Sequence, residues 1–491
     1  MTAAADPTPP LLGIILAAGR GVRAYPSTRY MPKVLLRIAG QPLIERNLAI
    51  LRDQLGIREI IIVIGYLGEQ IIDYFKKRDP GVRITFVVQR EQRGIAHALL
   101  QVEGMIGSRP FVVMLGDELY LGSNHGKLRQ LLANDCAGVL FFRREPDLRR
   151  VARNFVARLD GDRVLALEEK PRQPETELMG VGTYLLTERV FPYLKSAQPS
   201  SLRGEVEITD ALSAMAAREK VLACILDGDY LNVTTMEDVN SANYAIRDQQ
   251  FASYRISVVV PAYNEAATVG QVVQEFLAHP EVDEVLVVDN NSRDDTAALA
   301  AAAGARVVRE PGQGYGCALK RGMLEASGDL FILTEADGSF RARDLSKLLE
   351  YAKDCDMAIG TRTTRQLIEQ GANMDGVTRW ANVFFGKLIE VLWWGQEPRF
   401  TDVGCTFRAI WRDSFLDIRD FLTAPGPEFA TEMMIAMLLY RKRIIEIPVS
   451  YFPRAGGSSK HSVSHWAKAK TALRMLRTTL RHRFGPPPAR D

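Results

Sequence analysis

The chain has 491 residues, more than the roughly 100 to 200 of a typical domain, so we expect two large domains or three small ones. Apolar residues make up 47% and charged residues 25%, a balance that is typical of a globular protein and excludes a largely disordered or membrane-embedded chain. The formal net charge of +3 arises from 62 basic and 59 acidic residues and does not indicate a nucleic-acid partner.

The N-terminal segment, MTAAADPTPP, lacks the basic start and the apolar centre of a signal peptide, and we expect residues 1–10 to be disordered. No run of about 18 apolar residues occurs in the sequence. The five cysteines are far apart and never form a Cys-x-x-Cys pair, so neither a zinc site nor a disulfide framework is indicated. These features predict a protein that is cytoplasmic or peripheral to a membrane.

Apolar runs alternate with helix-length segments in the first half of the chain. The first run, LLGIILAAGRG at residues 11–21, breaks into a loop before a helical pattern. Uninterrupted runs of this kind are typical of parallel strands that are covered on both faces. The pattern predicts a doubly wound, Rossmann-like α/β domain over residues 11–250, with ligands at the carboxyl ends of its strands. The further predicted strands are residues 60–64, 84–88, 111–115 and 138–142.

The same pattern begins again at ISVVVPAYNEA, residues 256–266. It predicts a second doubly wound α/β domain over residues 251–462. Residues 463–491 are expected to form a basic amphipathic helix and a tail. The further predicted strands of the second domain are residues 285–288, 306–308, 330–333 and 357–360.

A glycine-rich turn with two cations follows the first predicted strand. In LAAGRGVRAYPSTRYMPK, Gly19 and Gly21 allow backbone N–H groups to approach a phosphate, and Arg23 and Lys33 supply positive charge. Two cations near such a loop suit a triphosphate whose leaving pyrophosphate gathers negative charge. Because glycine-rich turns also occur for purely structural reasons, the turn alone does not establish a nucleotide site.

Together with other motifs, this loop resembles that of the sugar-1-phosphate nucleotidylyltransferases. The resemblance covers roughly residues 11–243, and one departure is Val22, where the family usually has Thr or Ser. The matching motifs are LAAGRGVR with Pro32-Lys33, Gln89 followed by GIAHA (94–98), LGD (115–117), EEKP (168–171), VGTYLL (181–186) and EVEITDA (205–211).

The resemblance implies that a sugar 1-phosphate attacks the α-phosphorus of a nucleoside triphosphate and that pyrophosphate leaves. Because the nucleophile is already an anion, this reaction requires positioning and charge neutralisation and no general base. By the resemblance, Asp117 and Asn232 are the ligands of Mg²⁺ or Mn²⁺. Many members of the family have Asp at the second position, and Asn232 offers an oxygen but no charge.

The remaining residues of the first site are also implied by the resemblance. Lys170 is expected to clamp the sugar phosphate and Glu169 the sugar hydroxyls, while Gln89 and Gly94 read the edge of the base. His97 lies in an apolar context and is expected to pack within a helix. The other residues expected to bind nucleotide or sugar are Ala18, Gly19, Gly21 and Gly182.

In the second half, TEADGSF at residues 334–340 follows a predicted buried strand. Glu335 and Asp337 are two positions apart, so both carboxylates are expected on one side of the chain. Such a pair suits a divalent cation, although a solvated acidic turn would give the same sequence.

Residues 255–462 resemble the inverting glycosyltransferases with the GT-A fold, and among these the polyprenyl (dolichyl) phosphate sugar synthases. The resemblance implies that Glu335 and Asp337 occupy the metal motif, which is usually Asp-Ala-Asp, and hold Mg²⁺ or Mn²⁺ against the departing nucleoside diphosphate. Because of its extra methylene, Glu335 is expected to act at longer range than Asp337. By the same resemblance, Pro261, Tyr263 and Glu265 line the nucleotide and Asp289 contacts the base. Further matching motifs are GTR (360–362), TDVGCTFRA (401–409), PEFATEM (427–433) and IEIPVSYFPRAGGSSK (445–460).

The class of acceptor determines whether a base is required. A hydroxyl acceptor requires a carboxylate to remove its proton, and Asp402, Glu428 and Glu432 are the candidates. A lipid phosphate is already ionised and is expected to be surrounded by cations instead. The candidate cations, which favour the phosphate, are Arg362, Arg379, Arg408, Arg454 and Lys460.

Two apolar features bear on a lipid acceptor. In VFFGKLIEVLWW, residues 383–394, we expect Phe384, Phe385, Leu388, Leu392 and Trp393 to form an exposed stripe at a membrane interface, although core packing explains the stripe equally well. The helix predicted in HWAKAKTALRMLRTTLRHRF has Trp466, Leu473, Leu476, Leu480 and Phe484 on one face and basic residues elsewhere. This pattern favours anionic lipid at the cytoplasmic face of a membrane, with docking on the protein itself as the alternative.

The sequence thus predicts a bifunctional enzyme that makes a nucleotide sugar and transfers the sugar, with inversion, to an acceptor, for which a polyprenyl phosphate is favoured. UTP and glucose 1-phosphate are the simplest substrates for the first step. Two alternatives remain open at this point. The acceptor could be a soluble hydroxyl compound, or the first domain could be a nucleotide-binding module without catalysis.

Overall fold

The computed structural model describes residues 10–24, 27–131, 135–198, 207–372, 374, 376–396, 398–455 and 465–485. The chain divides into two compact units, Met1–Ala242 and Asn243–Asp491, called here the first and the second domain. Two sequence expectations fall outside the described residues, namely the disorder of residues 1–9 and the role of Lys460. None of the helices in the described part of the chain is both long enough and apolar enough to cross a membrane.

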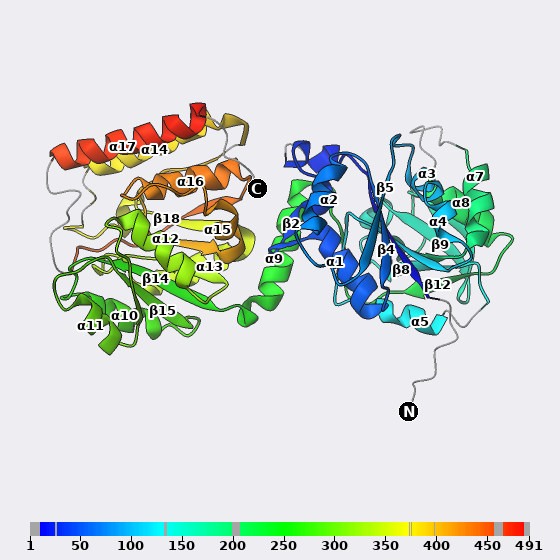
Figure 1. The fold of residues 1–491 in the computed structure, drawn as a ribbon, viewed down its shortest axis with the longest axis horizontal. Coiled ribbons are helices and arrows are strands. Elements are labelled where there is room, and N and C mark those ends of the chain that lie inside the picture. Colours follow the sequence, from blue (N-terminus) through cyan, green and yellow to red (C-terminus); the bar gives the residue numbers. More distant parts are fainter. Residues whose placement is uncertain are drawn as a thin grey trace. The chain divides into compact units, whose positions relative to one another are not determined.

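In the described part of the first domain, nine strands form one mixed sheet (Figure 1). Its four-strand edge β5-β4-β1-β6 is parallel, and the antiparallel strand β11 follows β6. In spatial order the strands are β5 (Arg83–Val88), β4 (Glu59–Ile64), β1 (Leu12–Ala17), β6 (Phe111–Leu115), β11 (Leu178–Leu186), β8 (Gly138–Arg144), β12 (Val221–Ile225), β10 (Arg163–Glu169) and β9 (Phe155–Asp160). Two small pairs lie outside this sheet, β2 (Arg37–Ile38) with β3 (Gln41–Pro42) and β7 (Glu118–Leu121) with β13 (Asp229–Asn232).

Helices cover both faces of the first sheet. Neighbouring residues of β1 point to opposite faces, so Ile14 packs in a core with α3 and α8 while Ile15 packs with α1 and α2. This alternation explains why the run is apolar at every position. The helices of this domain are α1 (Leu43–Ala49), α2 (Gly68–Lys76), α3 (Ile95–Leu100), α4 (Glu103–Ile106), α5 (Leu128–Leu131), α6 (Leu148–Val151), α7 (Phe191–Ser196) and α8 (Ile208–Ala216). Helix α9 (Met236–Gln250) continues from the first domain into the second.

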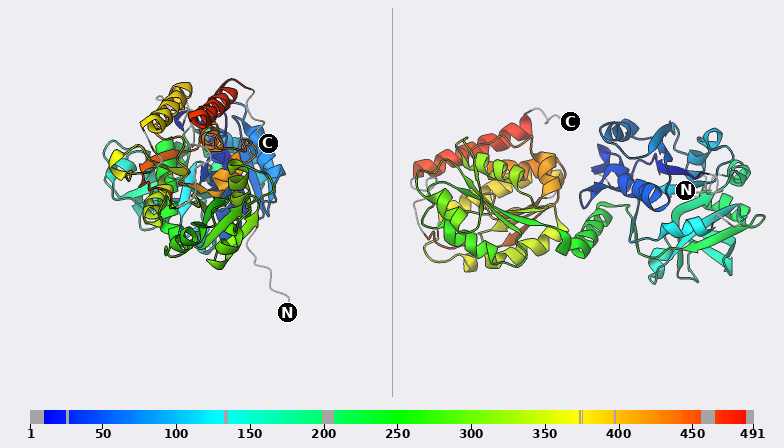
Figure 2. Two further views of the ribbon diagram at one scale, coloured as in Figure 1. Left: turned by 90° about the vertical axis from the view of Figure 1, so that its left-hand side faces the viewer. Right: turned by 60° about the horizontal axis from the view of Figure 1, so that its bottom comes forward.

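The described part of the second domain contains a seven-stranded mixed sheet with the same kind of parallel edge (Figures 1 and 2). Here β16, β15, β14 and β17 are parallel, and the antiparallel strand β19 follows β17. In spatial order the strands are β16 (Arg306–Arg309), β15 (Glu284–Asp289), β14 (Ile256–Ala262), β17 (Leu330–Leu333), β19 (Arg408–Trp411), β18 (Met357–Thr361) and β20 (Ile444–Pro448).

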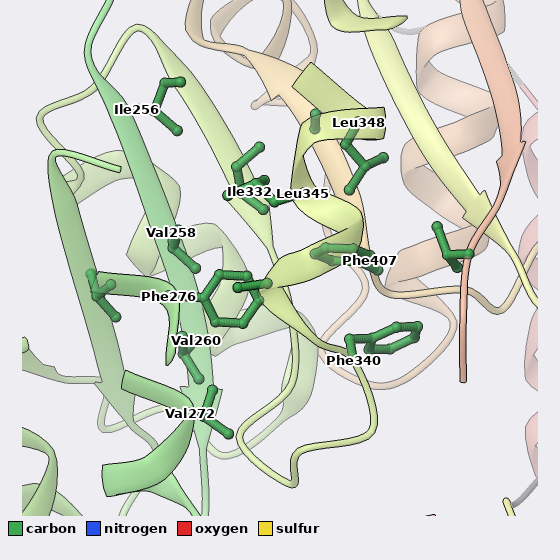
Figure 3. Close-up of a cluster of buried hydrophobic side chains, with 14 of the residues drawn as sticks. Ile256, Val258, Val260, Val272, Phe276, Ile332, Phe340, Leu345, Leu348 and Phe407 are labelled. Carbon is green, nitrogen blue, oxygen red and sulfur yellow. The ribbon is translucent and has the colours of Figure 1, made fainter. Parts of the chain in front are cut away.

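Two cores lie on the two faces of the second sheet. Figure 3 shows one of them, in which Val258 and Ile332 from the sheet meet Phe276 of α10, Leu345 of α13 and Phe407. The other core joins the sheet to α12, α14, α15, α16 and α17. The helices are α10 (Val269–Leu277), α11 (Thr296–Ala302), α12 (Tyr315–Glu325), α13 (Leu345–Asp354), α14 (Gly376–Leu392), α15 (Arg412–Ile418), α16 (Phe429–Leu439) and α17 (His465–Phe484).

Helices α14 and α17 lie side by side, and α17 also packs on α16 (Figures 1 and 2). The predicted exposed stripe of α14 is wrong in part, because Phe385 and Trp393 are buried in the core. In α17, Met475 and Thr479 are buried, so this helix docks on the protein body and still exposes most of its predicted apolar face. The exposed apolar residues, called here the α14–α17 surface, are Trp380, Phe384, Val391, Trp394, Trp466, Leu473, Leu480 and Phe484.

Candidate active sites

The glycine-rich loop of the first domain begins where β1 ends. Gly21 has a φ of +62°, a conformation that favours glycine, and its carbonyl accepts a hydrogen bond of 2.6 Å from Thr28 Oγ1. A Cβ atom at Gly21 would lie 3.1 Å from Lys33 Cβ, so the loop packs closely against this lysine. Arg23 is exposed on the turn Val22–Ala24. The loop therefore needs glycine for its own conformation and surrounds Lys33.

Lys33 and Asp117, 84 residues apart in the sequence, are in contact. Lys33 Nζ lies 2.7 Å from Asp117 Oδ2. Asp117 follows β6 at its carboxyl end, where Gly116 N–H donates to Leu16 O at 2.9 Å. A Cβ atom at Gly116 would lie 2.8 Å from Leu16 O, so only glycine permits this approach of the two strands. The structure thus brings the predicted cation and the predicted metal carboxylate together.

The pair β7–β13 brings Asn232 close to Asp117 in the chain fold. Asn232 is paired with Glu118, the residue after Asp117, and Val233 N–H donates to Asp117 O at 3.0 Å. One carboxylate and one amide oxygen are hard donors that suit Mg²⁺, which takes one or two carboxylates and completes its shell with phosphate oxygens and water. No group of three or more His, Cys, Asp or Glu side chains that could hold a metal occurs among the described residues. The two residues fit a cation that arrives with a triphosphate.

Glu118 was not predicted from the sequence, and it is the buried polar centre of this site. Its carboxylate accepts hydrogen bonds from Gly182 N–H at 2.8 Å, Tyr230 OH at 2.7 Å and Tyr120 OH at 2.5 Å. Burial raises the pKa of Glu118 to about 7, against the lowering effect of these hydrogen bonds. Gly182 stays a predicted nucleotide- or sugar-binding residue, and in this structure its N–H donates to Glu118. The only sequence signal was a carboxylate directly after LGD.

The other predicted residues of the first site form two small clusters. Gln89 Nε2 donates to Gly94 O at 3.2 Å and contacts His97 Nδ1 at 3.0 Å, so His97 holds the side chain that we expect to read the base. Lys170 has a φ of +49°, and its Nζ lies 2.5 Å from Glu169 Oε1. A lysine in this conformation is strained, and such strain is concentrated at functional sites.

In the second domain, Glu335 and Asp337 follow β17 and are held by hydroxyl groups. Thr406 Oγ1 donates to Glu335 Oε1 at 2.8 Å, and Ser339 Oγ donates to Asp337 Oδ1 at 2.6 Å. Asp337 is 1% exposed, and its Oδ2 accepts no hydrogen bond within the described residues but lies 2.7 Å from Arg454 Nε. This buried oxygen is paired with a positive charge, the Arg454 guanidinium, so the position favours a cation and the two carboxylates suit the predicted metal.

The free energy of unfolding of the second domain is expected to fall as the pH rises from about 4.5 to 7. Burial, and then the charge of Asp337, raises the pKa of Glu335 from 4.5 to about 7. Between these values the folded state holds a proton that the unfolded state has lost, so raising the pH favours unfolding.

Tryptophan fluorescence during urea unfolding in EDTA measures this change in the second domain alone, because all five tryptophans lie there. Glu335→Gln is expected to flatten the dependence on pH. An equal slope in the variant and in the parent protein would contradict the assignment to Glu335.

The residues predicted to bind the donor nucleotide lie at the carboxyl ends of β14 and β15, the same edge of the sheet as Glu335 and Asp337. Pro261 is in β14 and Tyr263 follows it, while Asp289 ends β15 and accepts a hydrogen bond from Ser292 N–H at 3.1 Å. Glu265 Oε1 lies 3.9 Å from Arg454 Nη1. Arg454, which was predicted for the acceptor phosphate, therefore contacts the predicted metal motif and lies between Asp337 and Glu265.

Two residues that were predicted for different acceptors are bound to each other. Arg362 Nε donates to Asp402 Oδ2 at 2.8 Å and Arg362 Nη2 to Asp402 Oδ1 at 2.9 Å. Asp402 is 0% exposed, and its Oδ2 also accepts from Arg362 N–H at 2.9 Å. A bidentate pair of this kind holds both charges in place. Asp402 stays a predicted base and Arg362 a predicted phosphate ligand, and either role requires this buried ion pair to open.

Arg408 and Glu432 are also structural in this fold. Arg408 is 1% exposed, and its guanidinium donates to the backbone carbonyls of Val403, Cys405 and Ala430. Glu432 accepts from the N–H groups of Thr423 and Ala424 at 2.9 and 2.8 Å. Burial opposes its charge, but hydrogen bonds from His482 and this turn keep the pKa of Glu432 below its usual value. The phosphate role of Arg408 and the base role of Glu432 stay predictions, and each would compete with these buried hydrogen bonds.

Glu428 and Arg379 keep their predicted roles as candidates. Glu428 Oε2 is buried without a hydrogen bond among the described residues, and Arg474 Nη1 of α17 lies 4.0 Å from it. Arg379 is half-buried in the first turn of α14, beside the exposed Trp380.

Comparisons with known proteins assign the two domains. The family model described as Nucleotidyl transferase matches residues 12–249, and the one described as Glycosyl transferase family 2 matches residues 257–415. The chain is similar to UTP–glucose-1-phosphate uridylyltransferase AglF of Haloferax volcanii, with 33% identity over 238 residues, 48% of this chain and 96% of that protein.

The chain is also similar to glucose-1-phosphate thymidylyltransferase of Streptomyces griseus, with 32% identity over 233 residues, 46% of this chain and 64% of that protein. A crystal structure of UDP-glucose pyrophosphorylase complexed with UDP-glucose aligns at 27% identity with a TM-score of 0.45, over 49% of this chain and 100% of that one. The predicted fusion is confirmed: the chain belongs to the nucleotidyl transferase family through its first domain and to glycosyl transferase family 2 through its second, and it unites a sugar-1-phosphate nucleotidylyltransferase with a glycosyltransferase.

Proposed function

We propose that the first domain makes a nucleotide sugar from UTP and glucose 1-phosphate and that the second domain transfers the sugar, with inversion, to a polyprenyl phosphate. The observation that carries the choice of acceptor is the α14–α17 surface, a set of exposed aromatic and aliphatic side chains on the glycosyltransferase domain. The names of the relatives, a uridylyltransferase and a thymidylyltransferase for glucose 1-phosphate, support the substrates of the first step.

In the first step, an oxygen of the sugar phosphate forms a bond to the α-phosphorus of the triphosphate, and the bond to the bridging oxygen of pyrophosphate breaks. Lys33 lies 2.7 Å from Asp117, at the end of β6, where its charge can stabilise the phosphate oxygens. Asp117 and Asn232 would hold a divalent cation, which neutralises charge on the leaving pyrophosphate when bound. In this proposal Lys170 binds the sugar phosphate, and Glu169 binds the sugar hydroxyls.

In the second step, an oxygen of the acceptor phosphate attacks the anomeric carbon, and the bond from that carbon to the nucleoside diphosphate breaks on the opposite face. Two of the three carboxylates considered as a base, Asp402 and Glu432, are engaged in buried hydrogen bonds. A nucleophile that is already ionised needs no base and therefore agrees better with this arrangement. We assign Arg379 to the acceptor phosphate. Glu428 would be the base if the acceptor were a hydroxyl.

The α14–α17 surface suits a bilayer that contains anionic lipid. Trp380 is 73% exposed and Trp466 is 85% exposed, and indole rings favour the membrane–water interface. Basic residues of α17, among them Lys470, Arg474 and Arg477, supply charge for anionic head groups. An apolar hollow of about 560 Å³ on this surface could take part of a prenyl chain. It is lined by Gly376, Trp380, Ala381, Phe384, Phe385 and Ala472.

The full chain is expected to bind vesicles that contain anionic lipid, and Trp380→Ser is expected to weaken this binding about tenfold. The reason is that the exposed indole ring of Trp380 would become buried in the bilayer, and burying a large apolar side chain contributes about 1.5–3 kcal/mol. Co-sedimentation with vesicles at low and high salt is the measurement, and high salt is expected to weaken binding further.

Tyr351→Ser is the matched control, because Tyr351 is an exposed aromatic residue on α13, which packs on the other face of the sheet. If Trp380→Ser and Tyr351→Ser bind vesicles equally well, the α14–α17 surface is not the membrane contact.

A screen of nucleoside triphosphates against sugar 1-phosphates, measured by pyrophosphate release, tests the first step. UTP with glucose 1-phosphate is expected to react fastest, with dTTP as the nearest competitor. Release with none of the pairs would favour a first domain that binds nucleotide without catalysis.

Extraction of the labelled product into organic solvent tests the second step, since a soluble acceptor would leave the label in water.

A further inference from the structure

Arg454 and the metal motif of the second domain share one oxygen atom. Arg454 Nε lies 2.7 Å from Asp337 Oδ2, and this is the carboxylate oxygen that accepts no hydrogen bond from the described residues. The other oxygen, Oδ1, is taken by Ser339, through its hydroxyl at 2.6 Å and its N–H at 2.9 Å. Asp337 therefore has a single oxygen to offer, and a guanidinium is in contact with it.

The backbone keeps Arg454 at this position. Ala455 N–H donates to Asp337 O at 3.0 Å, and Phe452 N–H donates to Ser339 O at 3.0 Å. The segment 452–455 thus runs along the metal motif, with the guanidinium on the carboxylate. Glu265, the other carboxylate near Arg454, is 3.9 Å away, so the closer partner is Asp337.

We propose that Arg454 and the divalent cation compete for Asp337 and that cation binding moves the guanidinium from Asp337 to phosphate oxygens of the donor. A cation ligated by Oδ2 lies within about 2.0–2.6 Å of that oxygen. The guanidinium cannot keep its contact there, because two positive groups would be brought together in a buried site. That the phosphate oxygens belong to a nucleotide-sugar donor rests on the proposed glycosyl transfer. The competition for Asp337 does not depend on which acceptor is used.

The proposal explains why the cation and the donor would bind together. A cation alone must break the ion pair between Arg454 and Asp337, which weakens its binding. A cation that arrives with a diphosphate gives the released guanidinium a new partner of opposite charge. The two ligands then stabilise each other's binding, and by linkage each increases the affinity of the other by the same factor.

The first domain has the same arrangement in unrelated residues. Lys33, the cation expected to contact the triphosphate, lies 2.7 Å from Oδ2 of Asp117, the carboxylate expected to ligate the metal. Both domains therefore place a phosphate-binding cation on a metal-binding carboxylate at the carboxyl end of a parallel strand. The repeated arrangement supports a functional origin, because the two ion pairs share no element of the fold.

The test measures Mn²⁺ binding to the full chain by calorimetry, with Asp117→Asn in every protein so that the site of the first domain is removed. Arg454→Gln is expected to bind Mn²⁺ about tenfold more tightly than the parent protein, within the usual range of coupling between sites. Arg454→Ala removes the same positive charge with a different side chain and is expected to give the same result as Arg454→Gln. Arg454→Lys keeps the charge and is expected to bind as the parent does. Saturating UDP is expected to tighten Mn²⁺ binding more in the parent than in Arg454→Gln.

Arg419→Gln is the control for a general change of charge, because Arg419 is half-exposed on the same domain and contacts Asp420. Its Mn²⁺ affinity is expected to equal that of the parent. Equal or weaker Mn²⁺ binding by both Arg454→Gln and Arg454→Ala would overturn the proposal. Tighter Mn²⁺ binding by Arg454→Gln, together with no glycosyl transfer to polyprenyl phosphate by the parent protein, would leave the competition intact and refute only the proposed acceptor.

Discussion

Replacing Asp117 by alanine is expected to slow pyrophosphate release from the triphosphate and sugar 1-phosphate by roughly 10²–10³-fold, as the loss of one preorganised electrostatic contact typically does. Asp117 is the one carboxylate of the proposed metal pair, because its partner is Asn232. It is also the counter-charge of Lys33, at 2.7 Å. The variant therefore loses the metal ligand and also the group that holds the lysine in position.

The matched control is Asp227→Asn, which removes an exposed carboxylate of the same domain that pairs with Lys127 at 3.0 Å. Its rate is expected to equal that of the parent. The Asp117→Ala chain is also expected to transfer sugar normally from a supplied nucleotide sugar, because the second domain has its own site. Pyrophosphate release at the parent rate in Asp117→Ala would refute the assignment of the metal site.

Asp337→Asn is expected to slow glycosyl transfer by roughly 10²–10³-fold, whereas Glu335→Gln is expected to slow it only about 10–100-fold. The difference follows from the oxygen atoms that each residue offers. Asp337 Oδ2 accepts no hydrogen bond among the described residues, while the two oxygens of Glu335 face Thr406 at 2.8 Å and Ser339 at 3.4 Å. Asp337 is thus placed to ligate the cation and Glu335 to act through neighbours.

Initial rates with a purified nucleotide sugar as donor measure this difference without involving the first domain. Ser346→Ala, on the exposed part of α13, is the control for the effects of mutagenesis and purification. Its initial rate of glycosyl transfer is expected to equal that of the parent protein. If Glu335→Gln abolishes transfer while Asp337→Asn leaves it intact, the ranking of the two carboxylates is wrong.

The parallel edges of both sheets could be predicted from the sequence because their strands are continuous apolar runs. Residues 330–333 and 285–288, for example, were predicted as strands and are found in β17, Leu330–Leu333, and β15, Glu284–Asp289. The antiparallel strands β11 and β19 were not predicted, since their pairing with β6 and β17 joins segments that are distant in the chain. Periodicity reports which faces are covered and does not report which strands are neighbours.

The carboxylates of the two sites could likewise be predicted, because each follows a strand and belongs to a motif. Their counter-ions could not. Arg362 and Asp402 were predicted for different acceptors and form one bidentate pair, and Arg408 is used for backbone carbonyls. An arginine in a motif gives no indication of its partner, because a guanidinium can donate hydrogen bonds to carboxylate, carbonyl and phosphate oxygens alike. Glu118 belongs to none of the motifs quoted from the sequence, and only its three hydrogen bonds in the structure identify it as part of the site.

The measurement that tests the account most directly follows label from glucose 1-phosphate into lipid. The full chain, UTP, labelled glucose 1-phosphate and polyprenyl phosphate in vesicles are incubated together and extracted with organic solvent. We expect label in the organic phase only when UTP and polyprenyl phosphate are both present. Asp117→Ala is expected to lose this transfer and to regain it when labelled UDP-glucose is supplied, whereas Asp337→Asn is not expected to regain it. Label that stays in the aqueous phase with every triphosphate and sugar phosphate tested, while pyrophosphate is released, would contradict the proposed lipid acceptor.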